Sequence, residues 1–263
     1  MLRILIIFVS LCAQVFVSGC SDSHSDQKSL ENVSENGNAL PTGEPVTEQG
    51  AAQEQCPESN AVLPENLKID SFIQYLNVLP KPLTAFCLFH YLPKPLQVNA
   101  TASKDSVQQA TGKTNPRLFF GVGMLHISIA LTNTGAARLE VAEIINDTES
   151  VKGEIGIPIR GEITPSAMYQ RAQLNETATT CGSCHLAERP AGAAYPESAF
   201  ISQAIRPEPS KDVPLDYLKG LAKACNPQDF GGELRCGILA ILAAEGGSIP
   251  YEFPPEMSTQ FRR

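Results

Sequence analysis

Apolar and polar residues alternate with a period of two in the middle of the chain. The alternation runs through three segments, 125–131, 138–144 and 151–163. It is typical of strands that bury one face. Asn133-Thr-Gly135 provides a turn between the first two segments, and Pro158 falls on the polar side of the third. We therefore expect an antiparallel meander whose last strand lies at an edge.

A short repeat precedes this meander. Pro80-Lys-Pro-Leu83 recurs as Pro93-Lys-Pro-Leu96, and each copy leads into an apolar stretch, 83–92 and 96–101. Two such proline-flanked stretches favour extended, edge-type strands. Together with the meander they predict a β-rich domain over residues 56–163, built as an antiparallel β-sandwich or partial barrel.

The pattern changes to a helical period after Thr164. Thr164 and Pro165 offer an N-cap followed by proline at the first helical position. The expected helices cover 165–174, 197–205, 214–224 and 233–245, the last ending at Gly246-Gly247. The predicted fold class is therefore α+β, with the β-rich domain followed by a small all-helical domain over 164–263.

The N-terminus has the pattern of an export signal. Arg3 precedes an apolar run over 4–17, which is short for a membrane span but suits a signal peptide over 1–19. Val17-Ser-Gly-Cys20 resembles the cleavage motif of bacterial lipoproteins. That resemblance implies a lipid on Cys20, and Ser21 after it implies sorting to the outer membrane, on its periplasmic or cell-surface face. The alternative is an ordinary signal peptide followed by a chance cysteine.

Residues 20–55 are polar and acidic. This stretch holds seven acidic residues against one lysine and almost no aliphatic side chains, so we expect a disordered tether between the lipid and the folded part. The whole chain has a net charge of −8 and a pI near 5.1. Such a balance argues against nucleic acid as a partner.

The segment with the clearest chemistry is Cys181-Gly-Ser-Cys184-His185. Two thiols at this spacing reach the two vinyl groups of one haem, and the adjacent histidine is delivered to the iron. The segment resembles the attachment motif of c-type cytochromes. The resemblance covers these five residues closely and the predicted helical domain loosely. It implies one haem c, bound covalently through Cys181 and Cys184, with His185 as the proximal ligand.

Two other interpretations of the cysteine pair remain. A thioredoxin-type redox pair belongs at a helix start in a βαβ unit, and no such unit is visible in the sequence. A zinc site needs a second closely spaced pair, whereas Cys225 and Cys236 are eleven residues apart.

Met257 is the candidate for the second iron ligand. It is the only methionine after the motif, and its proline-rich loop, Phe253-Pro-Pro-Glu-Met257, resembles the distal loop of class I cytochromes c. In that family a helix follows the loop, but here only six residues follow Met257, so packing against the core is the alternative. His126 lies on the polar side of a strand, which is typical of a solvated histidine.

The other cysteines suit an oxidising compartment. Cys56, Cys87, Cys225 and Cys236 are even in number, and their proximity in the sequence suggests Cys56–Cys87 and Cys225–Cys236. Four cysteines permit three pairings, and four buried thiols are a further alternative.

The function that follows is electron transfer by a membrane-anchored monohaem c-type cytochrome with a protein redox partner. The β-rich domain would dock that partner or orient the haem. One alternative is a five-coordinate haem sensor or peroxidase-like enzyme. Another is a haem-free surface binding module with a redox-active cysteine pair.

Overall fold

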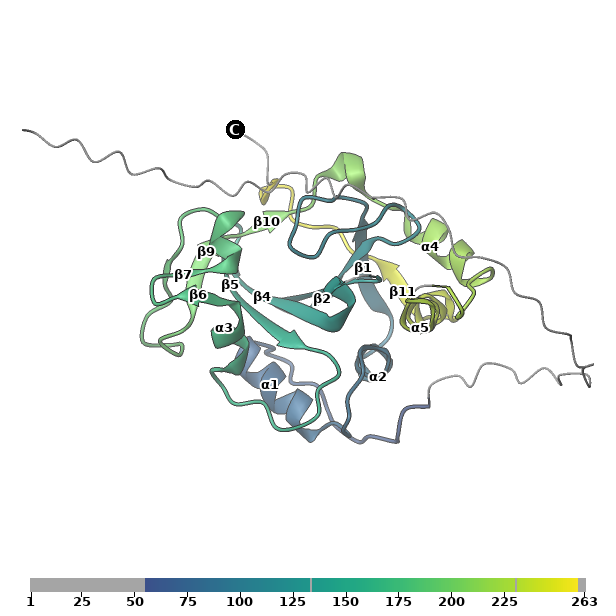
Figure 1. Ribbon diagram of the computed structural model, residues 1–263, viewed down its shortest axis with the longest axis horizontal. Coiled ribbons are helices and arrows are strands. Elements are labelled where there is room, and N and C mark those ends of the chain that lie inside the picture. The colour runs from purple at the N-terminus through teal and green to yellow at the C-terminus, as the bar shows by residue number, and fades with distance from the viewer. Residues whose placement is uncertain (1–54, 133, 230, 260–263) are drawn as a thin grey trace, which may run out of the picture.

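The computed structural model describes residues 55–259 apart from Asn133 and Phe230 (Figure 1). The predicted signal peptide, the lipid on Cys20 and all of the tether but its last residue lie outside the described residues and stay predictions. None of the described helices is long and apolar enough to cross a bilayer.

The described chain is organised around an eight-stranded sheet. In spatial order its strands are β11 (Ser248–Pro250), β1 (Leu96–Thr101), β2 (Arg117–Val122), β3 (Leu125–Ala130), β4 (Arg138–Asn146), β5 (Glu149–Gly156), β9 (Phe200–Gln203) and β8 (Arg189–Pro190). β1 and β11 are parallel, whereas every other neighbouring pair is antiparallel.

Helices and short elements complete the described fold. The helices are α1 (Ile69–Val78), α2 (Ala85–Tyr91), α3 (Ala167–Ala172), α4 (Leu215–Ala222) and α5 (Gly232–Ala243), with 3-10 turns η1 (Thr134–Ala137), η2 (Thr180–Ser183) and η3 (Pro209–Lys211). Two further pairs of short strands are β6 (Gln173–Asn175) with β7 (Ala178–Thr179), and β10 (Ile205–Arg206) with β12 (Ser258–Thr259).

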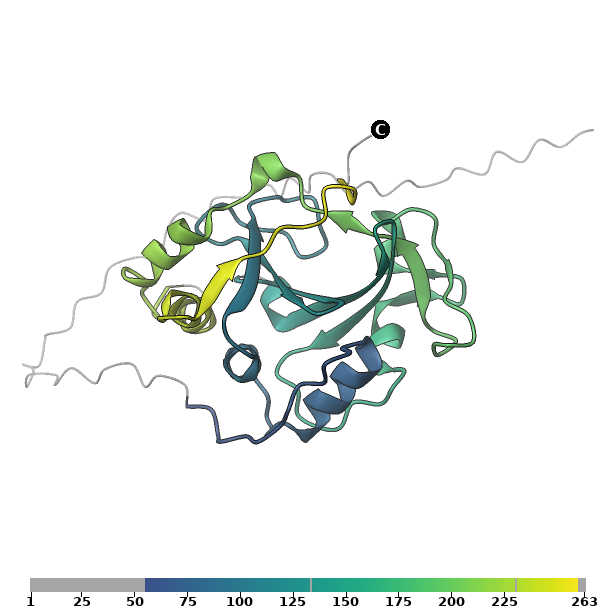
Figure 2. The ribbon, with the colours of Figure 1, turned by 180° about the vertical axis from the view of Figure 1, so that it is seen from behind.

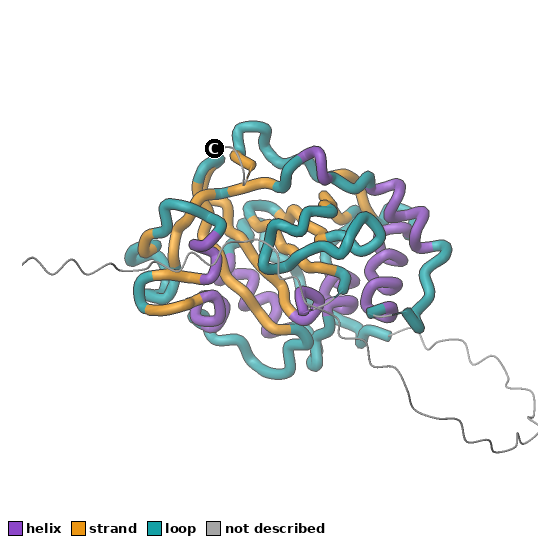
Figure 3. Tube along the Cα trace, turned by 45° about the horizontal axis from the view of Figure 1, so that its top comes forward, coloured by secondary structure: helices purple, strands orange, loops and turns teal. Residues whose placement is uncertain are grey.

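The helices lie on one side of the sheet and at one of its edges. α1 packs on β4 and α3 on β5, while α4 and α5 contact the β1–β11 edge (Figures 1 and 2). The opposite face carries β10, β12 and loops, one of which crosses in front of the strands in Figure 3. The sheet therefore has one face under helices and one under loops.

The predicted fold class is wrong. The chain forms a mixed α/β fold, because β8, β9 and β11 from its second half join the same sheet as the meander. The expected helix over 197–205 contains strand β9 instead, where Ser202 lies opposite Ser150 of β5. Pairing with a distant strand thus overrides the local helical preference.

The first half of the chain also contains helices that the pattern did not predict. The expected extended stretch over 83–92 is α2, which begins because Thr84 Oγ1 accepts a hydrogen bond from Cys87 N at 3.1 Å. α1 was missed, although Ile69, Phe72, Ile73 and Leu76 have helical spacing and are buried.

Other elements agree with the sequence. Strands over 96–101, 125–131 and 138–144 are confirmed as β1, β3 and β4, and the helices expected at 165–174, 214–224 and 233–245 as α3, α4 and α5. The strand expected over 151–163 ends earlier, at Gly156. It stops just before Pro158, which has no N–H to donate to a ladder.

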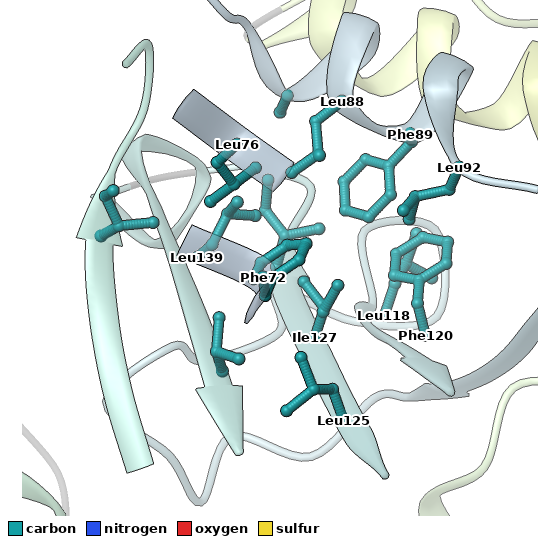
Figure 4. Close-up of a cluster of buried hydrophobic side chains, with 14 of the residues drawn as sticks. Phe72, Leu76, Leu88, Phe89, Leu92, Leu118, Phe120, Leu125, Ile127 and Leu139 are labelled. Carbon is teal, nitrogen blue, oxygen red and sulfur yellow. The ribbon is translucent and has the colours of Figure 1, made fainter. Parts of the chain in front are cut away.

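The core joins α1 and α2 to the sheet. Figure 4 shows side chains of both helices and of the strands pointing toward one another. Phe89 of α2 stacks on Phe120 of β2 with ring centroids 4.1 Å apart, and both are fully buried. This aromatic contact fixes α2 on the helix-covered face of the sheet.

Both expected disulfides are confirmed. Cys56 is bonded to Cys87, which ties the start of the described chain to α2. Cys225 is bonded to Cys236, which ties the loop after α4 to α5. Each cross-link restricts the unfolded chain and so stabilises the fold.

Replacing Phe89 by alanine tests this core. Phe89→Ala should lower the free energy of unfolding by about 3–5 kcal/mol, because it removes a buried ring and leaves a cavity beside Phe120. Urea unfolding followed by circular dichroism measures the change. Val78→Ala is the control, since Val78 is 67% exposed and its loss should be nearly neutral. Equal effects of the two substitutions would contradict the packing described.

Candidate functional site

The face of the sheet away from α1 and α2 carries polar side chains in register. One row across β2 to β5 consists of Phe119, Ser128, Glu140 and Glu154, and the next row across β3 to β5 consists of His126, Ala142 and Lys152. Ala142 is small, so it leaves a hollow between His126 and Lys152. All seven of these residues are buried or half-buried.

His126 corrects the expectation of a solvated histidine. Its side chain is 8% exposed, its Nε2 lies 2.6 Å from the hydroxyl oxygen of Tyr251, and its ring packs edge-on against Phe253. Burial lowers the pKa of His126 to about 4, so the ring is neutral at pH 7. The period-two pattern identified the face but could not show that distant loops cover it.

The cysteine motif forms a tight turn at η2. Thr179 Oγ1 accepts from Cys181 N at 3.1 Å. The Cys181 carbonyl in turn accepts from Cys184 N at 3.1 Å and from His185 N at 2.8 Å. This turn brings Cys181, Cys184 and His185 to the same wall of one cleft.

Glu188 holds the turn closed. Its carboxylate accepts from Thr179 N at 2.8 Å and from Thr179 Oγ1 at 2.5 Å. A Cβ atom at position 182 would lie 2.6 Å from Glu188 Oε2, so glycine is the residue that fits there without displacing the carboxylate. Glu188 and Gly182 therefore position the motif together.

The cleft lies between this turn and two loop segments. It encloses about 790 Å³ of empty space, including its open mouth, and residues in 101–107 and 205–208 form the other walls. A deeper pocket of about 460 Å³ shares Cys181 and His185 with it and reaches His126 and Lys152 on the sheet. The motif thus lies over the polar face of the sheet.

The ring of His185 has a defined tautomer. Its Nδ1 lies 2.9 Å from the carbonyl oxygen of Gln203. Because a carbonyl oxygen only accepts, Nδ1 carries the hydrogen. Burial, reinforced by the charge of Lys152, lowers the pKa of His185 to about 3. The ring is therefore neutral at pH 7, and Nε2 has a lone pair that could bind a metal.

Gln203, at the end of β9, anchors the motif in two ways. Besides accepting from His185, it donates its own N–H to the carbonyl oxygen of Leu186 at 3.0 Å. Gln203 itself pairs with Glu149 of β5. The imidazole orientation is thus set by the main chain of the sheet, and no side-chain signal in the sequence marks Gln203.

Lys152 lies beneath the motif and is half-buried. Its Nζ donates to Ser202 Oγ at 3.0 Å, to Gln203 O at 3.2 Å and to Ser150 Oγ. Burial lowers the pKa of Lys152 to about 8, against the opposing attraction of Cys181 and two glutamates. Sequence reasoning missed this residue, because a lysine on the polar side of a strand is normally solvated.

The two motif cysteines are not part of the disulfides. Burial, together with the charge of Glu140, raises the pKa of Cys181 to about 11, so the sulfur is a thiol at neutral pH. A redox-active pair needs the opposite shift. The environment of Cys181 therefore argues against the thioredoxin-type interpretation.

Charged side chains line the rest of the cleft. Arg117 pairs with Glu140 at 2.5 Å and lies over the Phe119 ring, 4.6 Å from its centroid. Arg206 of β10 lines the cleft and donates from Nε to Met257 O at 2.8 Å. Two guanidinium groups thus border the space beside the motif.

Met257 does not share the cleft with the motif. Its side chain is 1% exposed and packs with Ala204 and Phe253, and it is not among the described residues that line either pocket. The structure brings Cys181, Cys184 and His185 together but leaves Met257 in a neighbouring cluster. Its role as the second iron ligand stays a prediction.

The residue types at the cleft are those that one covalent haem c would need. Cys181, Cys184 and His185 all line it, His185 Nδ1 is occupied by Gln203 O, and Arg117 and Arg206 line it as well. By contrast, the described residues contain no group of three or more His, Cys, Asp or Glu side chains placed to hold a metal ion.

The protonation state of Cys181 can be tested in haem-free protein. With a pKa of about 11, its alkylation rate should rise roughly tenfold per pH unit from pH 7 to 10 without levelling off, because only the thiolate reacts. Mass spectrometry of the peptide containing Cys181 follows the reaction in a Cys184→Ser variant. A short peptide thiol in the same tube should level off near its own pKa. A plateau for Cys181 below pH 8 would contradict the raised pKa of this thiol.

Comparisons with known proteins add no family to this description. Protein-family models, curated proteins and solved structures were compared with the chain, and none matches. The similarity to c-type cytochromes accordingly stays a resemblance carried by five residues, and the site is interpreted from its own geometry.

Proposed function

We propose that this chain is a membrane-anchored, monohaem c-type cytochrome that carries electrons to or from a protein partner. The observation that carries the proposal is the joint position of Cys181, Cys184 and His185 on one wall of the cleft, with the His185 ring fixed by Gln203. Thioether bonds from the two cysteines would hold the haem, and His185 Nε2 would bind its iron.

Several residues of the chain would each have a separate role in holding the haem. When bound, the haem supplies a one-electron couple. The hydrogen bond from Nδ1 to Gln203 O keeps the His185 ring in one orientation and raises its basicity. Arg206, and Arg117 beside its pair with Glu140, would lie near the haem carboxylates, and the surrounding sheet would limit access of water. A lipid on Cys20 and the acidic tether would keep the folded part near the membrane.

Covalent attachment is tested by expression with a haem-attachment system. We expect haem to stay on the polypeptide after denaturation, and to be lost from a Cys181→Ala/Cys184→Ala variant, because no thioether can then form. Haem staining of a denaturing gel is the measurement. A Cys225→Ala/Cys236→Ala variant is the matched control, since it also lacks one cysteine pair but keeps the motif. Wild-type protein without covalent haem would refute the proposal.

A second candidate, a haem sensor or peroxidase-like enzyme with an open iron face, is favoured by one observation. Met257 packs with Phe253 away from the cleft, and no described methionine and no described histidine other than His185 lines the outer cleft. A haem whose second axial position lacks a protein ligand binds small molecules instead of only passing electrons.

Cyanide binding distinguishes the electron carrier from the haem sensor or peroxidase-like enzyme. For the electron carrier we expect no change in the absorption spectrum on adding cyanide at pH 7, because a second protein ligand fills the iron face. Met257→Leu, which conserves volume, should then open the site and make the spectrum respond. A cyanide response of the wild-type protein, unchanged in Met257→Leu, would instead support the sensor or enzyme.

A further inference from the structure

One carbonyl oxygen beneath the motif accepts two hydrogen bonds of different kinds. The oxygen of Gln203 lies 2.9 Å from His185 Nδ1 and 3.2 Å from Lys152 Nζ. A carbonyl oxygen has two lone pairs, so both bonds form at once. His185 and the ammonium group of Lys152 thus share an acceptor.

The ammonium group of Lys152 is held in place by neutral partners. Ser150 Oγ, Ser202 Oγ and Gln203 O accept from it, which matches its three hydrogens. Both serines are at most 2% exposed. None of the ion pairs among the described residues includes Lys152. The half-buried ammonium group therefore has neutral partners and no carboxylate in direct contact among the described residues.

The positive charge of Lys152 would affect the reduction potential of the haem iron in two ways, and both act in the same direction. A positive group in a poorly screened interior disfavours the more positive, oxidised iron. It also draws electron density from the shared carbonyl, which weakens the bond from His185 Nδ1–H and makes the ring a poorer donor to the iron. Both effects raise the reduction potential.

We propose that Lys152 sets the reduction potential of the haem by sharing the Gln203 carbonyl with His185. The inference rests on the proposed function, since it concerns the haem that His185 would bind. Lys152 is a positioning residue in this proposal: it would act on the haem through the Gln203 carbonyl and through its charge.

The test is the midpoint potential of the haem-loaded protein, measured by spectroelectrochemistry. Lys152→Met removes the charge with little change in length, and Lys152→Gln removes the charge but keeps a donor for Gln203 O. We expect a lower midpoint potential in both variants, with the larger fall in Lys152→Met. If Lys152→Met fails to fold, Lys152→Gln alone still decides the sign.

Lys94 supplies the matched control. Its Nζ also donates to three backbone oxygens, those of Phe89, His90 and Leu92, but at the end of α2 on the other side of the molecule. Lys94→Met should leave the midpoint potential unchanged. Lys94 is more exposed than Lys152, but a general effect of losing a lysine whose Nζ donates to backbone oxygens would shift the potential of both variants alike.

The outcomes distinguish this inference from the function on which it rests. If the wild-type chain binds no covalent haem, the proposed function fails. If it binds haem and Lys152→Gln keeps the wild-type potential, the role of Lys152 is overturned and the cytochrome assignment survives. A rise in potential, or an equal shift in Lys94→Met, also overturns it.

Discussion

The hydrogen bond from His185 Nδ1 to the carbonyl oxygen of Gln203 connects the sheet to the chemistry of the motif. It fixes the tautomer of the ring, so that Nε2 is the atom left for a metal. Because Gln203 ends a strand paired with β5, the orientation of the imidazole depends on the sheet and not on the turn alone. The turn that holds the cysteines and the sheet that orients His185 therefore form the site together.

The site lies over a face of the sheet that carries mainly polar side chains. Polar side chains on β2 to β5 are buried or half-buried under loops, and the charged ones find partners within the fold: Arg117 pairs with Glu140, and Arg138 pairs with Glu154. A buried charge without a partner would be costly. Lys152 avoids much of that cost through three neutral acceptors, and so keeps its charge close to the motif.

Local patterns in the sequence predicted strands β1, β3, β4 and β5, three of the helices and both disulfides. They did not predict β2, and β5 is not the expected edge strand, because it pairs with β9 as well as with β4. The long-range features were not predictable in this way. Residues 197–205 have helical composition, but Ser202 pairs with Ser150 across the sheet. The resemblance to a haem-attachment motif lies in five consecutive residues of the sequence. Lys152 and Gln203 come close to that motif only in the folded chain, so the sequence pattern did not identify them. α1 was an avoidable miss, since Ile69, Phe72 and Leu76 follow helical spacing.

The central claim is that one haem is bonded to Cys181 and Cys184. Mass spectrometry of the proteolytic peptide that spans Cys181 to His185, taken from protein exported by a host with a haem-attachment system, tests it most directly. The account predicts a peptide heavier by one haem, with neither thiol open to alkylation. A peptide of unmodified mass in which both cysteines alkylate would contradict it.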